Sequence, residues 1–578
     1  MPCLFNSFDP YFKQPFGAVR AGQSVHLSLC IPEELGYVDP HLVLQKEGRY
    51  DVPVHYRMKF DGQTPHQNHF SVDVTLNDVG LYFYYFDLYT DFRRIVRGPD
   101  NCGVVSWQEG ESWQITVYEA DFETPAPIKG KVFYQIFPDR FCEGVENKPM
   151  PFPDRLYQAD KHAEPFWQPN EVGGHLNEDY FGGDLKGIQM KLPYLRKMGV
   201  DYLYLNPIFE AHSNHRYNTA DYLNVDPLLG TNEDFEALCT AAQKYGIGIV
   251  LDGVFSHTGS DSRYFNRFRH YPGCGAYNSS NSVYARWYDF AHYPNDYRCW
   301  WNFRDLPAIN TANPDWRKYM ITGEHSVVKA WLHDGASGWR LDVADELPDD
   351  VLRDLRTAAK QTDPDSVLLG EVWEDAVTKV SYGARRQYAL GDALDSVMNY
   401  PLRDALIAFL TGRSTARALA DLLLSQRLNY PQPLYYALMN LTASHDVART
   451  RSALALDFDP RSRTRAQLAA LDVTDAMTAR GAQLQPLAAA VQFWLPGIPS
   501  IYYGDEAGMQ GLCDPFNRAP LQMCDTQTLQ WYAKLSALRH AHPALQRGEI
   551  AVFAPAGDVV CILSLIHISE PTRLGMIS

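Results

Sequence analysis

Residues 338–347 have the sequence GWRLDVADEL, in which a short apolar run carries Arg340 and Asp342 and is followed at once by two more acids. Burying an aspartate removes water from its carboxylate and favours the neutral form, so this placement needs compensation. Arg340 and Asp342 are two residues apart and therefore point to the same face of a strand. The stretch predicts a strand that delivers a paired cation and acid to one site.

Other apolar runs of this form alternate with segments of helical periodicity between residues 131 and 506. Buried parallel strands are continuous apolar runs that need helical crossovers, so the pattern predicts an α/β fold, a (β/α)8 TIM barrel. The segments 183–199, 231–246 and 348–363 repeat apolar residues at helical spacing. The predicted strands are KVFYQIFP (131–138), VDYLYLNP (200–207), GIGIVLDGV (246–254), ASGWRLDVA (336–344), SVLLGEVW (366–373), LDSVMNYP (394–401), YYALMNLTASHD (435–446) and IPSIYYGDE (498–506).

The pattern of apolar, polar and turn residues changes along the chain and predicts several regions. Residues 1–125 hold alternating runs such as SVHLSLCI between turn residues and predict an N-terminal β-sandwich. Residues 126–545 form the predicted barrel, and the long segment 256–313 after its third strand predicts an inserted subdomain. Residues 546–562 begin an alternating pattern that predicts the start of a truncated C-terminal β-domain. Residues 563–578 contain LSLIHISEPTR, which resembles a translated sequencing adapter; a natural short tail is the alternative.

Composition excludes several classes of partner and compartment. The net charge of −17 and the lack of a long Lys/Arg cluster would repel nucleic acid or an anionic membrane. The 10 cysteines form no C-x-x-C or regular framework, and neither a leader nor a long apolar span is present, so we expect a cytoplasmic protein. Aromatic residues make up 13% of the chain, including 35 Tyr, which fits either Tyr-rich strands and loops or stacking on sugars.

Chemically active residues recur at the carboxyl ends of the predicted strands, where the catalytic groups of such barrels lie. One acid at a strand end is usually a helix cap or an ion-pair partner, but acids at the ends of four strands are improbable as independent structural features. The residues selected by this rule are Asp252 and His257 after the third strand, Arg340 and Asp342 on the fourth, Glu371 on the fifth, and His445 and Asp446 after the seventh.

Several carboxylates facing one cavity suit the cleavage of glycosidic bonds, in which one acid attacks and another protonates the leaving oxygen. Arg340 can keep Asp342 ionised, and the apolar frame LLGEVW is expected to favour the protonated form of Glu371. Asp345 and Glu346 are expected to shape the substrate site or to cap the next helix. The chain contains none of the motifs G-x-G-x-x-G opening a helix, G-x-x-x-x-G-K-[ST], H-E-x-x-H or G-x-S-x-G.

The order and spacing of these stretches resemble the α-amylase superfamily of glycoside hydrolases (family 13), and within it the neopullulanase, cyclomaltodextrinase and maltogenic amylase group. The stretches that match are VFYQIFPDRF, GVDYLYLNPIFEA, DGVFSH, LPAINT, GWRLDVADE, GEVW, SHD and GIPSIYYGDE. The resemblance implies a catalytic (β/α)8 barrel with a subdomain after strand three and a C-terminal β-sandwich. It also implies a retaining mechanism, with the two main carboxylates about 5 to 5.5 Å apart.

Site residues are implied by the resemblance position by position. Asp342 resembles the nucleophile, Glu371 the general acid and base, and Asp446 the third carboxylate, which grips hydroxyls of the sugar. Tyr217 would stack under the sugar, His257 and His445 would bond its hydroxyls, Arg340 would orient Asp342, and Asp252 would support Arg340. The implied substrate-binding residues are Tyr217, Asp252, His257, Arg340, Trp373 and His445.

Calcium is bound by many members of this group through an Asn/Asp-rich loop after the PDRF element. This chain has CEGVENKP there, so Cys142, Glu143 and Val145 stand where oxygen ligands are needed, although Gly183 and Asp184 match the other half of the site. A hard cation needs six to eight oxygen ligands. We therefore expect calcium binding to be weak or absent and no cofactor to be required.

The leading hypothesis is a hydrolase of α-1,4-glucosidic bonds, with α-1,6 bonds as a further substrate, acting on maltooligosaccharides, cyclodextrins, pullulan or starch. One alternative is a glucanotransferase or transglycosylase that uses the same covalent intermediate. Another is a non-catalytic carbohydrate-binding relative, which the retained acids oppose. The N-terminal β pattern suits the group's starch-binding-like module, which often mediates homodimers.

Overall fold

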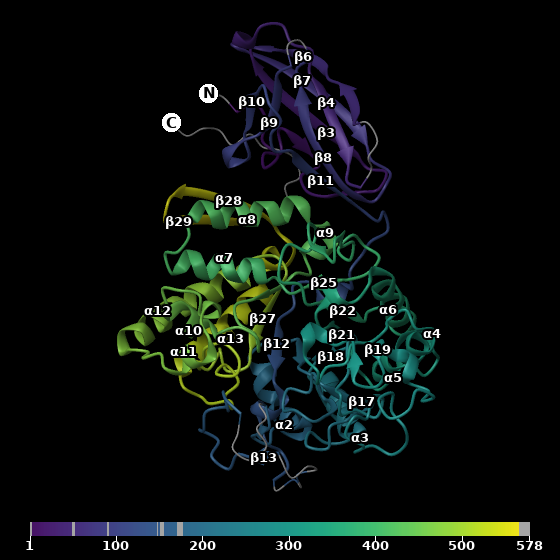
Figure 1. The fold of residues 1–578 in the computed structure, drawn as a ribbon. Coiled ribbons are helices and arrows are strands. Elements are labelled where there is room, and N and C mark those ends of the chain that lie inside the picture. The colour runs from purple at the N-terminus through teal and green to yellow at the C-terminus, as the bar shows by residue number, and fades with distance from the viewer. Residues whose placement is uncertain are drawn as a thin grey trace.

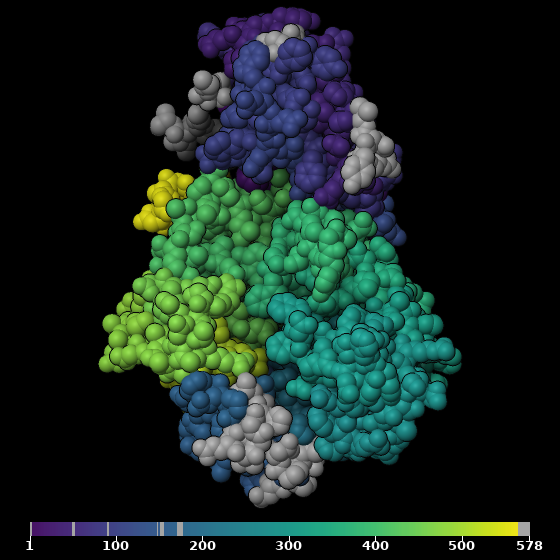
Figure 2. Space-filling model, in the orientation of Figure 1, coloured from purple at the N-terminus to yellow at the C-terminus, as the bar shows by residue number. Residues whose placement is uncertain are grey.

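The computed structural model describes residues 3–48, 53–89, 92–146, 148, 150, 155–169 and 177–565. An N-terminal domain of two β-sheets sits at one end of the molecule and packs on the helices of a large barrel domain (Figure 1). The space-filling view shows the N-terminal domain in purple resting on the green segments of the barrel, with the last hairpin in yellow beside it (Figure 2).

The barrel is an eight-stranded, all-parallel sheet, and the predicted (β/α)8 fold is confirmed. Each apolar run that was expected to be a strand forms one. An isolated parallel bridge between Met398 and Met439 joins the two ends of the sheet and closes the barrel. In spatial order the strands are β25 (Ser396–Val397), β22 (Val367–Gly370), β21 (Gly338–Leu341), β18 (Gly248–Gly253), β15 (Tyr202–Leu205), β12 (Phe133–Ile136), β27 (Ile498–Tyr502) and β26 (Met439–Leu441).

Helices cover the outside of the barrel and connect most of its strands. The fifth connection differs, because residues 371–395 cross from β22 to β25 through loops and a small hairpin, β23 (Val380–Ser381) with β24 (Ala384–Arg385), without an α-helix. The helices are α1 (Pro138–Phe141), α2 (Leu185–Lys197), α3 (Asn232–Lys244), α4 (Pro314–Arg317), α5 (Val327–His333), α6 (Asp349–Thr362), α7 (Tyr400–Leu410), α8 (Ala416–Asn429), α9 (Gln432–Tyr435), α10 (Thr450–Ala455), α11 (Arg465–Ala469), α12 (Asp475–Trp494), α13 (Thr526–Ala541) and α14 (Pro543–Arg547).

Local signals explain where the first long helices begin. The side chain of Asp184 accepts the backbone N–H of Gly187 and so caps α2. Thr231 and Asp234 exchange side-chain and backbone hydrogen bonds in a capping box at the start of α3. Each cap satisfies backbone donors that the first turn of a helix leaves unpaired.

The N-terminal domain packs two sheets face to face around a buried aromatic cluster. Phe5 contacts Trp113 with ring centroids 4.7 Å apart, and Tyr84 stacks on the same indole. One sheet has the order β1 (Lys13–Gln14), β3 (Ser24–Pro32), β7 (Gln67–Thr75), β6 (Lys59–Thr64); the other has the order β10 (Gly103–Ser106), β9 (Arg94–Arg97), β8 (Gly80–Asp87), β11 (Trp113–Tyr118), β2 (Val19–Arg20), with β4 (His41–Lys46) between β8 and β5 (Val54–Arg57).

Residues 256–313 form a small, irregular unit over one side of the barrel mouth. It contains the hairpin of β19 (Phe290–His292) and β20 (Asp296–Tyr297) and two short 3-10 helices, Ala285–Trp287 and Trp300–Asn302. Its buried rings include Phe265 and Tyr288, whose centroids are 4.9 Å apart. These rings belong to the same hydrophobic cluster as the side chains between the barrel and its helices, so the long connection after the third barrel strand packs continuously onto the barrel.

A last hairpin, β28 (Glu549–Ala556) and β29 (Val559–Leu565), packs on α8. Ile550 and Val552 are buried in this contact, and Arg427 on α8 donates a hydrogen bond to the carbonyl of Ile550. β29 includes the first three residues of the stretch 563–578, while 566–578 lie outside the described residues. Over the described ranges, no helix has the length and hydropathy needed to cross a membrane.

Candidate active site

Strand register places the predicted acids in two layers at the mouth of the barrel. Along β18, Val250 faces the interior while Ile249 and Leu251 face the helices, so Asp252 also faces inward. Asp252 is paired in register with Arg340 of the neighbouring strand. Asp342 lies two residues beyond Arg340, and Glu371 lies two residues beyond Leu369, the register partner of Arg340. Asp342 and Glu371 thus occupy the same layer, above Asp252 and Arg340.

Arg340 is the centre of this cluster and is fully buried. Its Nη1 lies 2.7 Å from Oδ1 of Asp252 and 2.9 Å from Oδ1 of Asp342, and its Nη2 lies 2.7 Å from Oε2 of Glu371. The planar guanidinium can hold several carboxylates in fixed directions at once. One cation therefore orients the three acids toward the open end of the barrel.

Glu371 is surrounded by more hydrogen-bond donors than its sequence frame suggested. Its Oε2 accepts the backbone N–H of Val343 at 2.8 Å in addition to the ion pair with Arg340, and its Oε1 accepts the indole N–H of Trp373 at 3.0 Å. The carboxyl oxygens are thus contacted by an arginine, a backbone N–H and an indole N–H, in addition to the apolar neighbours that the frame LLGEVW led us to expect. The neighbouring side chains are apolar, but the groups that touch the carboxyl oxygens are polar.

Desolvation and mutual repulsion make the cluster as a whole retain protons. Burial raises the pKa of Asp342 well above its usual value, and the nearby Glu371 and Asp252 raise it further despite the opposing effect of Arg340. Burial and the charge of Glu371 raise the pKa of Asp446 to about 7. The acids of the cluster outnumber the cations beside them and are largely removed from solvent. The cluster can therefore hold a proton near neutral pH.

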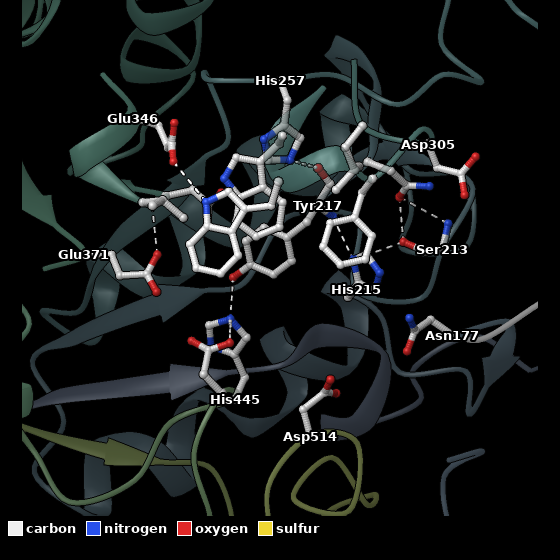
Figure 3. A pocket seen from close by; sticks show the side chains of 18 of the residues that line it. Asn177, Ser213, His215, Tyr217, His257, Asp305, Glu346, Glu371, His445 and Asp514 are labelled. Atoms are coloured by element: carbon white, nitrogen blue, oxygen red, sulfur yellow. Dashed lines mark hydrogen bonds and ion pairs between the residues drawn. The ribbon is translucent and has the colours of Figure 1, made fainter. Parts of the chain in front are cut away.

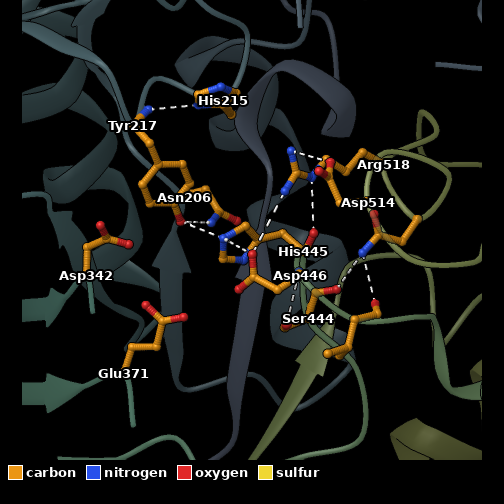
Figure 4. A network of polar contacts seen from close by, with 12 residues as sticks. Asn206, His215, Tyr217, Asp342, Glu371, Ser444, His445, Asp446, Asp514 and Arg518 are labelled. Carbon is orange, nitrogen blue, oxygen red and sulfur yellow. Dashed lines mark hydrogen bonds and ion pairs between the residues drawn. The ribbon is translucent and has the colours of Figure 1, made fainter. Parts of the chain in front are cut away.

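Tyr217 and His445 form a flat surface at the floor of the pocket (Figure 4). Their rings stack with centroids 5.4 Å apart and an interplanar angle of 7°, and the Tyr217 hydroxyl lies 2.6 Å from Nε2 of His445. The same hydroxyl donates to Oδ2 of Asp252 at 2.8 Å. Burial lowers the pKa of His445 well below its usual value and that of His257 to about 4, so both imidazoles are neutral hydrogen-bonding groups.

Asp446 lies across the pocket from Asp342 and Glu371, and its environment includes a cation that sequence reasoning missed (Figure 4). Arg518, in the loop after β27, is 3.9 Å from Oδ1 of Asp446 and forms a 2.7 Å ion pair with Asp514. Its Nε also donates to the carbonyl of His445 at 3.1 Å. No strand or helical pattern surrounds Arg518, so periodicity offers no signal for it.

Asn206 was also missed, although the strand-end rule covers its position after β15. Its Nδ2 donates to the Tyr217 hydroxyl at 2.9 Å, and its Oδ1 accepts from Gln135. Its amide side chain is neither charged nor an imidazole, so a strand-end rule limited to those groups passes over it, whereas a rule that includes amides selects it.

Val343 connects the two main acids through a strained backbone. It has φ +36° and ψ +70°, a left-handed conformation that is unfavourable for a β-branched residue. The conformation directs its N–H to Oε2 of Glu371 at 2.8 Å, directly after Asp342 in the chain. Strain of this kind persists where the surrounding structure enforces it, and it is often found at functional sites.

The acids open into a pocket of about 1190 Å³, which is larger than a pocket for a single small ligand (Figure 3). An aromatic stack made of Trp300, Trp301 and Phe303 forms part of its wall. Trp300 lies 5.5 Å from the ring of His257, 5.2 Å from Trp301 and 5.9 Å from Phe303, with near-parallel planes. The stack leads from the floor of the pocket to Trp301 at the rim, which is 69% exposed.

Glu346 joins the two sides of this rim. It accepts hydrogen bonds from the Trp301 indole at 3.3 Å and from the Tyr382 hydroxyl at 2.7 Å. Asp345 accepts from Tyr388 and lies 3.3 Å from the ammonium group of Lys379. Asp345 and Glu346 were expected either to shape the pocket or to cap the following helix. Neither side chain caps α6, and both line the pocket.

The two calcium candidates lie at the start of α2, away from the acids. The N–H of Gly183 donates to the carbonyl of Asp139, and the carboxylate of Asp184 is bound by backbone N–H groups and by Lys148. In the part of the chain that the structure describes, no three His, Cys, Asp or Glu side chains are grouped as metal ligands. The donor set around Asp184 does not fit a hard cation.

The fold and site together define a TIM-barrel protein with a carboxylate-lined cleft at the carboxyl ends of its strands. Residues 135–528 match the family model described as alpha amylase, catalytic domain. The chain belongs to the α-amylase family, as the resemblance implied.

Relatives of known name share most of this chain. It is 33% identical over 614 residues to amylopullulanase of Thermoanaerobacterium saccharolyticum, covering 96% of this chain and 46% of that protein. It is 32% identical to cyclomaltodextrinase of Geobacillus thermopakistaniensis (strain MAS1), covering 76% of this chain and 67% of that one. The solved type III pullulan hydrolase from Thermococcus kodakarensis is 25% identical with a TM-score of 0.63, covering 97% and 91%. The chain spans less than half the length of the amylopullulanases that it matches.

Proposed function

We propose that the protein is a retaining glycoside hydrolase that cleaves α-1,4-glucosidic bonds in maltooligosaccharides, cyclodextrins, pullulan or starch. The observation that carries the proposal is the contact of Arg340 with both Asp342 and Glu371, which sets two carboxylates side by side at the base of an open pocket. Acids placed as near neighbours favour the double-displacement route over inversion, which needs space for a water molecule between them.

In the first step, Asp342 would attack the anomeric carbon while Glu371 delivers a proton to the leaving oxygen. Arg340 would keep Asp342 oriented, and its shared contact with Glu371 couples the proton affinities of the two acids. In the second step, Glu371 would take a proton from water while the water oxygen attacks the anomeric carbon, and the bond between that carbon and Asp342 breaks. This proton returns Glu371 to its acid form, ready for the next cycle.

The remaining site residues would hold the sugar at the cleavage point. The stacked Tyr217 and His445 provide a flat apolar surface for one ring face. Asp446, partly exposed and opposite Glu371, would accept hydroxyl hydrogen bonds, and neutral His257 would bond a further hydroxyl. Trp373, held by stacking on Tyr400 at 4.0 Å, would fix the position of Glu371 through its indole N–H.

Transfer to a second sugar is the alternative outcome of the same intermediate. The exposed Trp301 and Tyr382, bridged by Glu346, offer an acceptor-binding surface at the rim. The names amylopullulanase and cyclomaltodextrinase of the relatives support both α-1,4 and α-1,6 bonds and cyclic substrates as candidates. A homodimer through the N-terminal domain and a cytoplasmic location remain predictions.

A product profile on pullulan, a cyclodextrin and starch tests the proposal. Maltose or panose as products would support hydrolysis, and chains longer than the substrate would support transfer. Correctly folded protein that releases no reducing sugar and forms no longer chains from any of the three would contradict the proposed function.

A further inference from the structure

Two lysine side chains converge on the turn formed by residues 181–184, which precedes α2 at the end of the barrel opposite the N-terminal domain (Figure 1). The ammonium group of Lys148 lies 2.6 Å from Oδ2 of Asp184 and donates to the carbonyl of Gly182 at 2.6 Å. The side chain of Lys148 is only 10% exposed and that of Asp184 only 2%. A positive charge is therefore held in a dry pocket between a carboxylate and a backbone carbonyl.

The second lysine extends the same arrangement. Lys161 donates to the carbonyl of Phe181 and to the Tyr157 hydroxyl, and its Nζ lies 3.1 Å from Oε2 of Glu143. It also lies 4.4 Å from the centre of the Tyr157 ring. The carbonyl oxygens of two neighbouring residues in the turn, Phe181 and Gly182, are thus each bound by a lysine.

The carboxylate of Asp184 has no vacant direction for another cation. It accepts the backbone N–H of Gly187 at 2.6 Å, of Val145 at 2.9 Å and of Gly144 at 3.1 Å, besides the ammonium of Lys148. The close approach depends on Gly144, since a Cβ there would lie 2.4 Å from the backbone nitrogen of Gly187. N–H groups that point at the carboxylate would repel a metal ion placed there, whereas a hard cation needs six to eight oxygen ligands directed toward it.

We infer that the ammonium group of Lys148 is a built-in cation that joins the loop containing residues 143–146 and 148 to the turn 181–184 in place of a bound metal ion. It bridges a side-chain carboxylate and a backbone carbonyl from the turn, as a hard cation would, but is covalently attached to the loop. A bound metal stabilises the folded state by an amount that grows with the logarithm of its free concentration, whereas the contribution of an attached ammonium does not depend on any concentration. The stability of this region is therefore independent of calcium and insensitive to chelators.

Thermal unfolding of the full chain tests this inference without relying on the proposed activity. We expect the melting temperature of the unaltered protein to be the same in excess EDTA and in millimolar calcium chloride. Lys148→Met keeps an unbranched apolar stem but removes the charge, leaving Asp184 buried without its cation, and should lower the melting temperature by roughly 4 to 10 °C in both solutions. Lys186→Met, at an exposed position on α2, is the matched control and should leave it unchanged.

Metal content gives a readout that needs no variant to fold. Elemental analysis of the unaltered protein, after incubation with calcium chloride and gel filtration, should find no stoichiometric calcium. A melting temperature that falls in EDTA and is restored by calcium, or one bound calcium per chain, would overturn the inference. It would also be overturned if Lys148→Met melted at the same temperature as Lys186→Met.

Discussion

At the scale of single residues, Arg340 sets the behaviour of the active-site acids because it contacts three of them through one guanidinium. Removing one acid changes the electrostatic field at the others. The titration of the site therefore belongs to the cluster, and pH effects are best read from variants that remove one charge at a time.

Asp446→Asn should remove the free-energy cost of an ionised carboxylate that is only partly exposed and lies near Glu371. Its pKa in the folded state is raised to about 7, so the folded protein binds this proton more tightly than the unfolded chain does. Stability contributed by the bound proton is complete below about pH 4 and is lost as the pH rises to about 7. The loss is at most about 4 kcal/mol.

Melting curves at several pH values check this prediction. Asp446→Asn should melt a few degrees above the unaltered protein at pH values above 7 and should lose that advantage toward pH 4, while its hydrolytic activity falls strongly. Asp558→Asn, at an exposed turn, is the control. A melting difference that does not vary with pH would show that Asp446 does not titrate in this range.

At this scale the sequence indicated the acids and their arginine but not the contacts that tune them. Strand periodicity selects Asp252, Arg340, Asp342 and Glu371 because β-strands place alternate residues on one face. The donors around Glu371 come from a strained backbone at Val343 and from an indole, and neither is visible in a spacing pattern. Arg518 reaches the site from an irregular loop.

At the scale of elements, the aromatic stack in residues 256–313 extends the wall of the pocket from His257 to the rim. Trp300 packs between His257 and Trp301, so each ring supports the next. The unusual backbone of Trp301, with φ +46°, places its indole at the rim.

Trp301→Ala should weaken the binding of long oligosaccharides without altering the chemical step. Loss of one aromatic stacking contact should cost about 0.5 to 1.5 kcal/mol of binding free energy. We therefore expect the KM for long maltooligosaccharides to rise about 3- to 10-fold, with kcat nearly unchanged. Steady-state kinetics on short and long substrates would show the difference. Trp494→Ala, another exposed tryptophan at the end of α12, is the control. An equal effect on short and long substrates would place Trp301 outside the extended site.

Element prediction succeeded for the barrel strands because their apolar runs are uninterrupted and buried on both faces. It did not foresee that residues 371–395 lack a helix. The α/β pattern leads one to expect a crossover helix there, but the segment instead forms the β23–β24 hairpin and the Tyr382 side of the pocket rim. The hairpin and its flanking loops stand where a crossover helix was expected.

At the scale of the whole molecule, a bidentate ion pair connects the N-terminal domain to the barrel. Arg385, in the β23–β24 hairpin, binds both carboxylate oxygens of Glu47 at 2.9 and 2.7 Å, and both side chains are about a quarter to a third exposed. The hairpin that shapes the pocket rim is thus also a docking point for the other domain.

Reversing the two charges tests this connection. Glu47→Arg and Arg385→Glu should each destabilise the docked domain by about 1 kcal/mol, a modest value because the pair is partly exposed, and the double variant should recover most of the loss. Melting temperatures of the four proteins form the double-mutant cycle. Additive losses in the double variant would mean that the pair does not couple the domains.

The proposed retaining mechanism requires Asp342 to act as the nucleophile and to carry the covalent intermediate. The most direct measurement is to incubate the Glu371→Gln variant with an activated fluorinated α-glucosyl or α-maltosyl donor, digest it, and locate the added mass by peptide mass spectrometry. Slow turnover without the general base should let the covalent intermediate accumulate, so we predict one glycosyl group on the peptide containing Asp342. A label on another residue, or turnover of the donor with no labelled peptide and with inversion at the anomeric carbon, would contradict the account.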